Sequence, residues 1–525
     1  MTKQLHEGRS LIAKNSIFNL FGLILPMLVG VLTIPYIVKG LGTNGYGILS
    51  IAFMLLGYFS IFDLGLSRAT VKFVAAHLSP DKIQEVPKLV WTSLSLLVAL
   101  GCIGGVVMAA FVPLSVTRFF KMPPSLVGEA RTSLFILCVS MPVMLSNDAL
   151  RGVLEAAQRF DLVNYVKVPA SILFYLAAAM AIPFGVRVSG IVLLLVLIRL
   201  ASSGAYLHFA FRVFPGLRTD FSISGKVARP LAAFGGWVMV TNTVGPICGY
   251  LERFLIASVL SVSLLTYYSA PYDLVSRIII FPASIVPSLF PYFSFHGSQG
   301  GTEVSDVTSR VLKYILLVMT PVTAVFVFFS REILQLWLGS QFAAQSAVVL
   351  QLAALIFFIS AFAMIPYTSV QALGRPDLKA ILDVVALPTY AFGAWWLTRR
   401  MGINGAALAK LLITFIDFSF LYAFAWKLKA FSVRDCITGP LLRALAASAA
   451  MVLVVLAIES LHAKLAVSII LLAICFATYL ATFWVVAVDD EDRATIRALL
   501  RERFSGFREE GVPAAIEVGG NDVGV

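Results

Sequence analysis

The chain has 525 residues, of which 59% are hydrophobic and only 13% are charged. A soluble domain is about half apolar and about a quarter charged, so this composition excludes an ordinary string of soluble domains. The formal net charge is +12. A basic balance of this kind can report nucleic-acid binding or membrane topology, and the distribution of the charges along the chain separates these two explanations.

The apolar residues come in long runs. A helix needs about 20 residues to cross about 30 Å of hydrocarbon. The segments of about ten alternating residues that a membrane barrel would show are absent from the sequence. We therefore predict an all-α integral membrane protein with about fourteen membrane helices. The apolar runs cover residues 14–38, 45–65, 90–112, 131–150, 163–183, 188–210, 229–258, 264–293, 311–330, 344–368, 380–398, 403–426, 438–458 and 464–487.

Lysine and arginine fall mainly in alternate loops. With the N-terminus inside, 27 of the 40 Lys and Arg residues lie in inside segments and 9 lie in outside segments. Cytoplasmic loops carry such an excess, so we predict a multi-pass protein of the inner (plasma) membrane with both termini cytoplasmic. The charge predicts contact with anionic lipid headgroups and no nucleic-acid partner. No small-residue cleavage site follows the first run, so we expect the first helix to stay in the protein.

An internal repeat divides the chain. Residues 155–162 resemble residues 371–378, and residues 188–190 resemble residues 403–405, at offsets of 216 and 215. A repeat unit of six helices returns the chain to the same side, which predicts parallel lobes related by an axis along the membrane normal. The predicted organisation is a six-helix lobe over 1–225, a second six-helix lobe over 226–430, two additional membrane helices over 431–488, and a cytoplasmic tail over 489–525 that begins amphipathic and ends disordered.

Eight segments of the sequence form a recognisable set of motifs. They are LGTNGYGILS (41–50), FDLGLSRATVKFVA (62–75), RGVLEAAQRFDLVN (151–164), FGGWVMV (234–240), LERFLIASVL (251–260), YYSAPYDLVSRI (267–278), QALGRPDLKA (371–380) and GINGAALAK (402–410). With these motifs the chain resembles the oligosaccharide flippases of polysaccharide biosynthesis, a family in the same superfamily as the multidrug and toxic-compound extruders and the lipid II flippases. The resemblance extends from about residue 10 to 485, and its loop motifs follow the first and tenth predicted helices.

The resemblance implies a carrier, not an enzyme, that needs no cofactor. It implies two lobes around a central cavity, which opens alternately to each side and moves undecaprenyl-diphosphate-linked oligosaccharide from the inner to the outer leaflet. The implied partners are this substrate, membrane lipids and the polysaccharide polymerase or export machinery, with no oligomeric state specified. Relatives often carry Asp in the motif where this chain has Glu252, and the acidic character is kept.

Ionisable residues inside the predicted helices are the candidate site residues. Such a residue costs at least about 2.5–3.5 kcal/mol near the bilayer centre, so its default interpretation is functional. Arginine suits a diphosphate because its planar donors can bind two oxygens at once. Arg199 lies about 16 Å into its predicted helix, close to the midplane. The cavity candidates are Arg199, Glu252, Arg253, Asp273, Arg277, Lys410 and Asp417.

Structural pairing is the alternative explanation for these charges. Arg277 has Asp273 four residues earlier on the same helix face. Lys410 and Asp417 are seven residues apart and share a similar face. Snorkelling toward the inner surface is the simplest explanation for Asp383. The pairs considered are Arg199 with Asp417, Arg277 with Asp273, and Glu252 with Arg277.

Other residue types give weaker signals. The five cysteines are scattered and form no CxxC or Cys/His cluster, which predicts neither a metal site nor a disulfide framework. Aromatic residues could stack on sugars, although interface belts are their commoner use in membranes. The aromatic candidates are Tyr267, Tyr268, Tyr272, Trp395 and Trp396.

Two other functions were weighed. A cation-coupled multidrug extruder of the same superfamily would need a carboxylate-centred cation site in place of Arg-rich walls. A membrane glycosyltransferase or polymerase would need a catalytic carboxylate pair or a large aqueous loop. The sequence shows neither feature of such an enzyme, and the longest predicted outside loop, around residues 113–130, is short.

Overall fold

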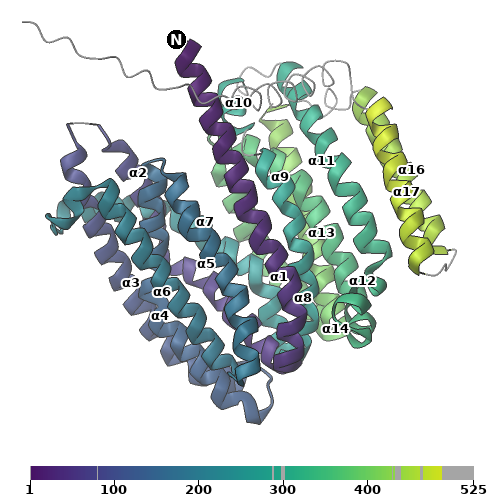
Figure 1. Cartoon of the computed structure of the whole chain (residues 1–525), viewed down its shortest axis with the longest axis horizontal. Coiled ribbons are helices and arrows are strands. Elements are labelled where there is room, and N and C mark those ends of the chain that lie inside the picture. Colours follow the sequence, from purple (N-terminus) through teal and green to yellow (C-terminus); the bar gives the residue numbers. More distant parts are fainter. Residues whose placement is uncertain are drawn as a thin grey trace, which may run out of the picture. The chain divides into compact units, whose positions relative to one another are not determined.

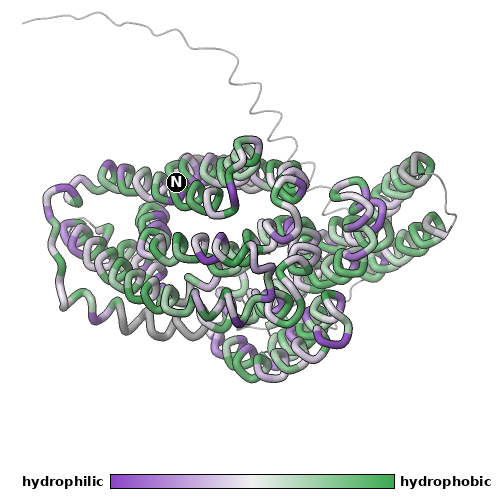
Figure 2. The backbone as a smooth tube through the Cα atoms, turned by 90° about the horizontal axis from the view of Figure 1, so that it is seen from below, coloured by the Kyte–Doolittle hydropathy of each residue, from purple (hydrophilic) through white to green (hydrophobic). Residues whose placement is uncertain are grey.

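The computed structural model describes residues 2–79, 81–286, 289–296, 302–428, 430–431, 439–460 and 465–486. Within these residues the regular secondary structure is entirely helical. Ten of the described helical segments are long and apolar enough to cross a membrane, and Figure 2 shows hydrophobic residues along most of the helix lengths. The chain is an all-α integral membrane protein, as predicted. The predicted tail, 489–525, lies outside the described residues.

The first half of the chain contains six long helices and one short one, which Figure 1 labels in order. Because the sequence offers long runs with few charges, the helices extend well beyond the average soluble helix. They are α1 (Thr2–Tyr58), α2 (Leu66–Ala76), α3 (Val86–Leu114), α4 (Pro124–Ala156), α5 (Phe160–Ala181), α6 (Val188–Val213) and α7 (Gly225–Leu255).

The second half is more divided. The predicted run 264–293 is interrupted by a 3-10 turn at Arg277–Ile279 and by Pro282 within a short helix. Proline removes a backbone donor and weakens a helix at that position. The helices are α8 (Val262–Ser276), α9 (Ile280–Ile285), α10 (Leu289–His296), α11 (Thr302–Phe328), α12 (Ser330–Trp337), α13 (Ser340–Ala372), α14 (Pro376–Lys427), α16 (Gly439–Ser460) and α17 (Leu465–Val486).

Two of these elements, α1 and α14, each join two helices at a glycine. Gly42 has φ 69° and Gly402 has φ 63°, a backbone region that favours glycine. A Cβ on Gly405 would lie 2.0 Å from the carbonyl oxygen of Leu397. In a straight helix these residues would be about 12 Å apart, so the chain turns back at Gly402. Each element therefore holds two predicted runs, which is one reason why ten spans are found; the figure of fourteen stays a prediction.

The repeated segments share a local conformation. Gln158 and Gly374 both have positive φ, and each is followed by an arginine just before a helix. The Arg159 amide donates to Leu154 and the Arg375 amide donates to Val370, again at an offset of 216. Each arginine then pairs with the aspartate two residues on, at 2.8 Å and 3.0 Å. The hydrogen bond with the Asp161 carboxylate raises the pKa of Arg159.

The predicted lobes meet at one end of the helices, which we call the Gly42 end. A single buried apolar cluster there includes residues from α1, α4, α6, α8 and α13. The hydroxyl of Thr266 donates to the carbonyl of Thr43 at 2.6 Å, and Ser263 donates to the Thr43 hydroxyl at 3.0 Å. A Cβ on Gly47 would lie 2.1 Å from the Val262 carbonyl oxygen. Glycine is therefore required for this approach.

A second apolar cluster lies toward the other end of the first lobe. It contains buried residues of α2, α3, α4, α5 and α6, together with Leu231 of α7. Helix α7 accordingly packs against α2 and α3. The chain divides into two compact units, the first of which holds residues 1–304 and 322–431. In the second unit, α16 packs against α17, where the Ser448 and Tyr479 hydroxyls lie 3.0 Å apart.

Candidate functional site

A basic cavity of about 400 Å³ lies between α1, α4, α5 and α6 of the first lobe and the end of α8. We call it the central cavity. Two of the predicted site residues, Arg199 and Arg277, line it together. Its lining also carries hydroxyl and amide groups that can bind polar ligands. The charged and polar residues of its wall are Asn147, Arg151, Lys167, Ser171, Tyr175, Arg199, Ser202, Tyr206 and Arg277.

Arg277 reaches this cavity from the 3-10 turn that ends α8. Its Nη2 donates to the Tyr175 hydroxyl at 2.8 Å, and the guanidinium lies 5.3 Å from the centre of the Tyr175 ring. Its Nε is buried with no hydrogen-bond partner among the described residues. A Cβ on Gly30 would lie 2.7 Å from Nη2, so this glycine leaves room for the guanidinium. The arginine is held by aromatic contacts, and part of its donor set is unused.

Arg199 lies on α6, and its side chain is exposed. Within the described part of the chain, no carboxylate lies within ion-pair distance of Arg199, Arg277 or Lys167. Arg151 is different, because it pairs with Glu155 at 3.2 Å and with Asp148 at 3.6 Å. The wall of the cavity therefore has an excess of positive charge that the described residues do not neutralise. Such a wall favours an anionic ligand.

The three pairings considered as the structural alternative do not occur among the described residues. Asp273 does not pair with Arg277; its Oδ1 lies 2.5 Å from Nη2 of Arg253. Arg253 also lies over the rings of Tyr250 and Tyr272. Arg277 donates instead to Tyr175, so each of these two charges has its partner on another helix.

Glu252 and Asp417 have other partners than those predicted. Glu252 is 1% exposed; its Oε1 lies 2.8 Å from the ammonium of Lys410 and accepts a hydrogen bond from Tyr390. Asp417 pairs with Lys379, with 3.1 Å between Oδ2 and Nζ. These acidic groups are compensated within the second lobe, so they are not available to Arg277 or Arg199.

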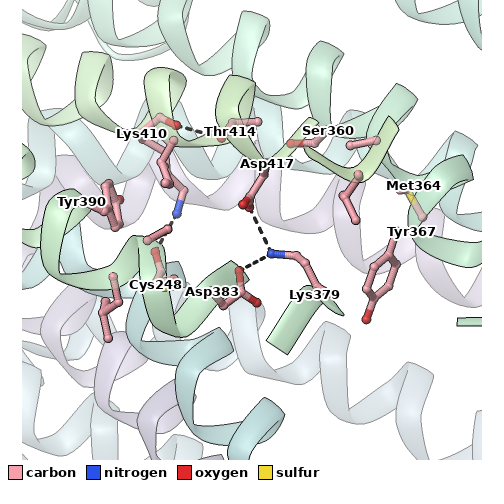
Figure 3. Close-up of a pocket in the computed structure, with 15 residues that line it drawn as sticks. Cys248, Ser360, Met364, Tyr367, Lys379, Asp383, Tyr390, Lys410, Thr414 and Asp417 are labelled. Atoms are coloured by element: carbon pink, nitrogen blue, oxygen red, sulfur yellow. Dashed lines mark hydrogen bonds and ion pairs between the residues drawn. The ribbon is translucent and has the colours of Figure 1, made fainter. Parts of the chain in front are cut away.

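Lys379 is the centre of a second group of charges, which Figure 3 shows between Asp383 and Asp417. Asp383 pairs with Lys379, and its snorkelling toward the inner surface stays a prediction. Lys410 also donates to the carbonyl of Cys248 at 2.7 Å. These residues line a pocket of about 300 Å³, in which every described acidic side chain contacts a lysine. Lys410 and Asp417, which their spacing predicted to share a similar helix face, both line this pocket.

Sequence reasoning missed Lys379, Arg151, Lys167 and Tyr175. The three cations were assigned to inside loops because they lie close to the ends of apolar runs. The spacing of Lys379 with Asp383, and of Arg151 with Glu155, is i to i+4, which is the signal that could have placed them on helices. Of the aromatic candidates, Tyr267 and Tyr268 are buried. Among the described residues no group of three or more His, Cys, Asp or Glu is placed to hold a metal ion.

The helices have the fold of known membrane transporters. The structure of the lipid II flippase MurJ in an inward closed conformation covers 90% of this chain and 99% of its own, with a TM-score of 0.67 and 13% identity. An inward-facing multidrug resistance MATE family transporter of the MOP superfamily covers 79% of this chain and 99% of its own, with a TM-score of 0.66 and 14% identity. These likenesses define a class of multi-pass membrane proteins.

The sequence comparisons are more specific. The family of polysaccharide biosynthesis proteins matches residues 12–295, which is more than half of the chain, and the chain belongs to this family. The protein named "Putative O-antigen transporter" from Shigella flexneri is 28% identical over 420 residues, covering 77% of this chain and 96% of that relative. The resemblance stated from the motifs is thereby confirmed.

Proposed function

We propose that the chain is a flippase that moves undecaprenyl-diphosphate-linked oligosaccharide from the inner to the outer leaflet during surface polysaccharide biosynthesis. The observation that carries the proposal is the central cavity, where Arg199 and Arg277 face one space with no described carboxylate partner. A diphosphate and a glycan are too polar to cross hydrocarbon unaided. Fixed guanidinium groups in a polar cavity lower that barrier.

The cavity contains contributions from both predicted lobes, 1–225 and 226–430. Parallel repeats place their substrate site at the repeat interface and move one half against the other. The matched turns at Arg159 and Arg375 support this repeat, as do the contacts that join the lobes at the Gly42 end. We take the Gly42 end as the outer side of the inner membrane, in keeping with cytoplasmic termini. In this state the outer end is closed.

The named relatives support a carrier in preference to an enzyme. One relative is named a putative O-antigen transporter and a protein of the same fold is named a lipid II flippase, and both names describe carriers. The multidrug extruder keeps the same fold. In the pocket around Lys379 the described carboxylates already contact lysines, which favours the flippase over an extruder with an open cation site. The polysaccharide polymerase or export machinery would take over the product.

Deletion of the gene tests this function. The expected result is loss of surface polysaccharide together with accumulation of lipid-linked oligosaccharide in the inner leaflet, and recovery of both by the intact gene. Accumulation is the discriminating measurement, because loss of a glycosyltransferase would remove the lipid-linked oligosaccharide. A deletion strain with normal surface polysaccharide and increased drug sensitivity would favour the extruder.

A further inference from the structure

A second basic pocket lies at the Gly42 end, away from the central cavity. It has a volume of about 550 Å³, and we call it the Arg118 pocket. Its wall takes Arg118 and Lys121 from the segment between α3 and α4, Val259 from the turn after α7, and Trp395 and Arg399 from α14. The pocket is therefore built from both predicted lobes.

The charges of this pocket have one sign. None of the described residues that line it is acidic, and the described part of the chain places no carboxylate at ion-pair distance from Arg118 or Arg399. The Lys121 ammonium donates to the Val259 carbonyl at 2.6 Å. The Arg399 guanidinium lies 4.3 Å from the centre of the Trp395 ring. Stacking fixes this guanidinium but leaves its donors free for an anion.

The pocket exists because the two lobes touch beside it. The backbone amide of Lys121 donates to the carbonyl of Ala257 at 3.0 Å, and the amide of Val262 donates to the carbonyl of Lys121 at 3.0 Å. Separation of the lobes at this end would move Arg118 away from Arg399. A ligand that contacts both arginines binds this state better than the separated one, so it favours closure.

We propose that the Arg118 pocket binds a lipid-borne phosphate group and that the bound phosphate holds the Gly42 end closed. Phosphate fits because two guanidinium groups can each present paired donors to its oxygens. The phosphate can belong to the diphosphate of a polyprenyl carrier or to an anionic phospholipid headgroup. The inference rests on the proposed function for its orientation, since it takes the Gly42 end as the outer side.

Binding is tested with the full-length protein in nanodiscs of phosphatidylcholine, in three preparations that contain no further lipid, added phosphatidylglycerol, or added undecaprenyl diphosphate without glycan. Native mass spectrometry measures the retained lipid. The double variant Arg118→Gln, Arg399→Gln should retain at least tenfold less of the added anionic lipid than the parent. The control Arg400→Gln should retain as much as the parent, because Arg400 stacks on Trp396 outside the pocket.

The phosphate source is the added lipid whose retention falls in the double variant. The proposal would be overturned if the double variant and the parent retained equal amounts of added phosphatidylglycerol and equal amounts of added undecaprenyl diphosphate. Closure has its own measurement, the rate of disulfide formation between Thr43→Cys and Ser263→Cys in a cysteine-free background. The retained lipid should raise this rate in the parent but not in the double variant; an equal rise in both would overturn the closure part. A normal phenotype of the deletion strain would refute the flippase function and leave these binding results intact.

Discussion

At the residue scale, the intramembrane charges form two kinds of environment. Arg199 and Arg277 face a cavity and have no described carboxylate partner, whereas the charges around Lys379 and Lys410 contact one another. Both environments lower the high free-energy cost of placing a charge within the hydrocarbon layer. They differ in what remains for a ligand, because an internally paired charge has less to offer an external group than an unpaired guanidinium.

Substitution of Arg277 distinguishes two roles for this residue, binding of the diphosphate or charge balance alone. Arg277→Lys should reduce polysaccharide export at least tenfold while the protein level stays normal, because lysine keeps the charge but lacks the planar fork. The measurement is complementation of the deletion strain, with protein level determined by immunoblot. Arg131→Lys, at a residue stacked on Phe135 away from the cavity, is the matched control and should export normally. Full export by both Arg277→Lys and Arg277→Ala would remove this residue from the site.

The Lys379 group should act on stability. Lys379→Met leaves Asp383 and Asp417 in a half-buried pocket without their cation, and loss of one partner from a buried pair costs about 3–5 kcal/mol. We expect a lower melting temperature in detergent, measured by fluorescence-detected gel filtration. Adding Asp383→Asn and Asp417→Asn to Lys379→Met should recover most of the loss, since it removes the uncompensated charges. If Lys379→Met alone is as stable as the parent, the ion pairs of Lys379 with Asp383 and Asp417 contribute nothing to stability.

At the element scale, glycines decide where the long helical elements turn. The apolar runs and their approximate ends could be predicted from composition, because helices and hydrocarbon thickness leave little choice of length. The turns at Gly42 and Gly402 were also implied by the gaps between runs. The interruption of the predicted run 264–293 after α8 was not, since a run of apolar residues with prolines gives no measure of how far each proline diverts the chain.

Alanine in place of the glycine at either turn should lower the stability of the protein. Gly42→Ala and Gly402→Ala force a residue with a Cβ into positive φ, which costs about 1–3 kcal/mol. No other atom lies near the added Cβ at either position, so the cost is one of backbone strain alone. Gly393→Ala, in the same element as Gly402 and with equally open space, should be neutral or slightly stabilising. Equal melting temperatures for the three variants would contradict the strained turns.

At the scale of the whole molecule, the sequence predicted the class of protein better than the contacts of its charged residues. The motifs indicated a family that the comparisons confirm, and the topology from charge counting stays a prediction. The pairings considered do not form because each of these carboxylates finds its partner on another helix, within the same predicted lobe. Glu252 and Lys410 are 158 positions apart, and no local pattern reports that distance.

The contact of the lobes at the Gly42 end can be weakened without touching the cavity. Gly47→Val would place a side chain against the Val262 carbonyl, where even a Cβ would lie at 2.1 Å. We expect this variant to favour separated lobes, seen as faster labelling of Ser263→Cys by a membrane-impermeant maleimide in intact cells. Gly204→Val, where an added Cβ meets open space, is the control. Unchanged labelling in the Gly47 variant would mean that this contact does not control opening.

The central claim is that lipid-linked oligosaccharide crosses the membrane by alternating separation of two lobes. The direct measurement is outward exposure of lipid-linked oligosaccharide in proteoliposomes that hold a cysteine-free protein with Thr43→Cys and Ser263→Cys, whose hydroxyls lie 3.0 Å apart in the parent. Oxidation should lock the Gly42 end and stop exposure, and reduction should restore it, while the single-cysteine proteins should be insensitive to both treatments. Continued exposure with the disulfide fully formed would contradict the account.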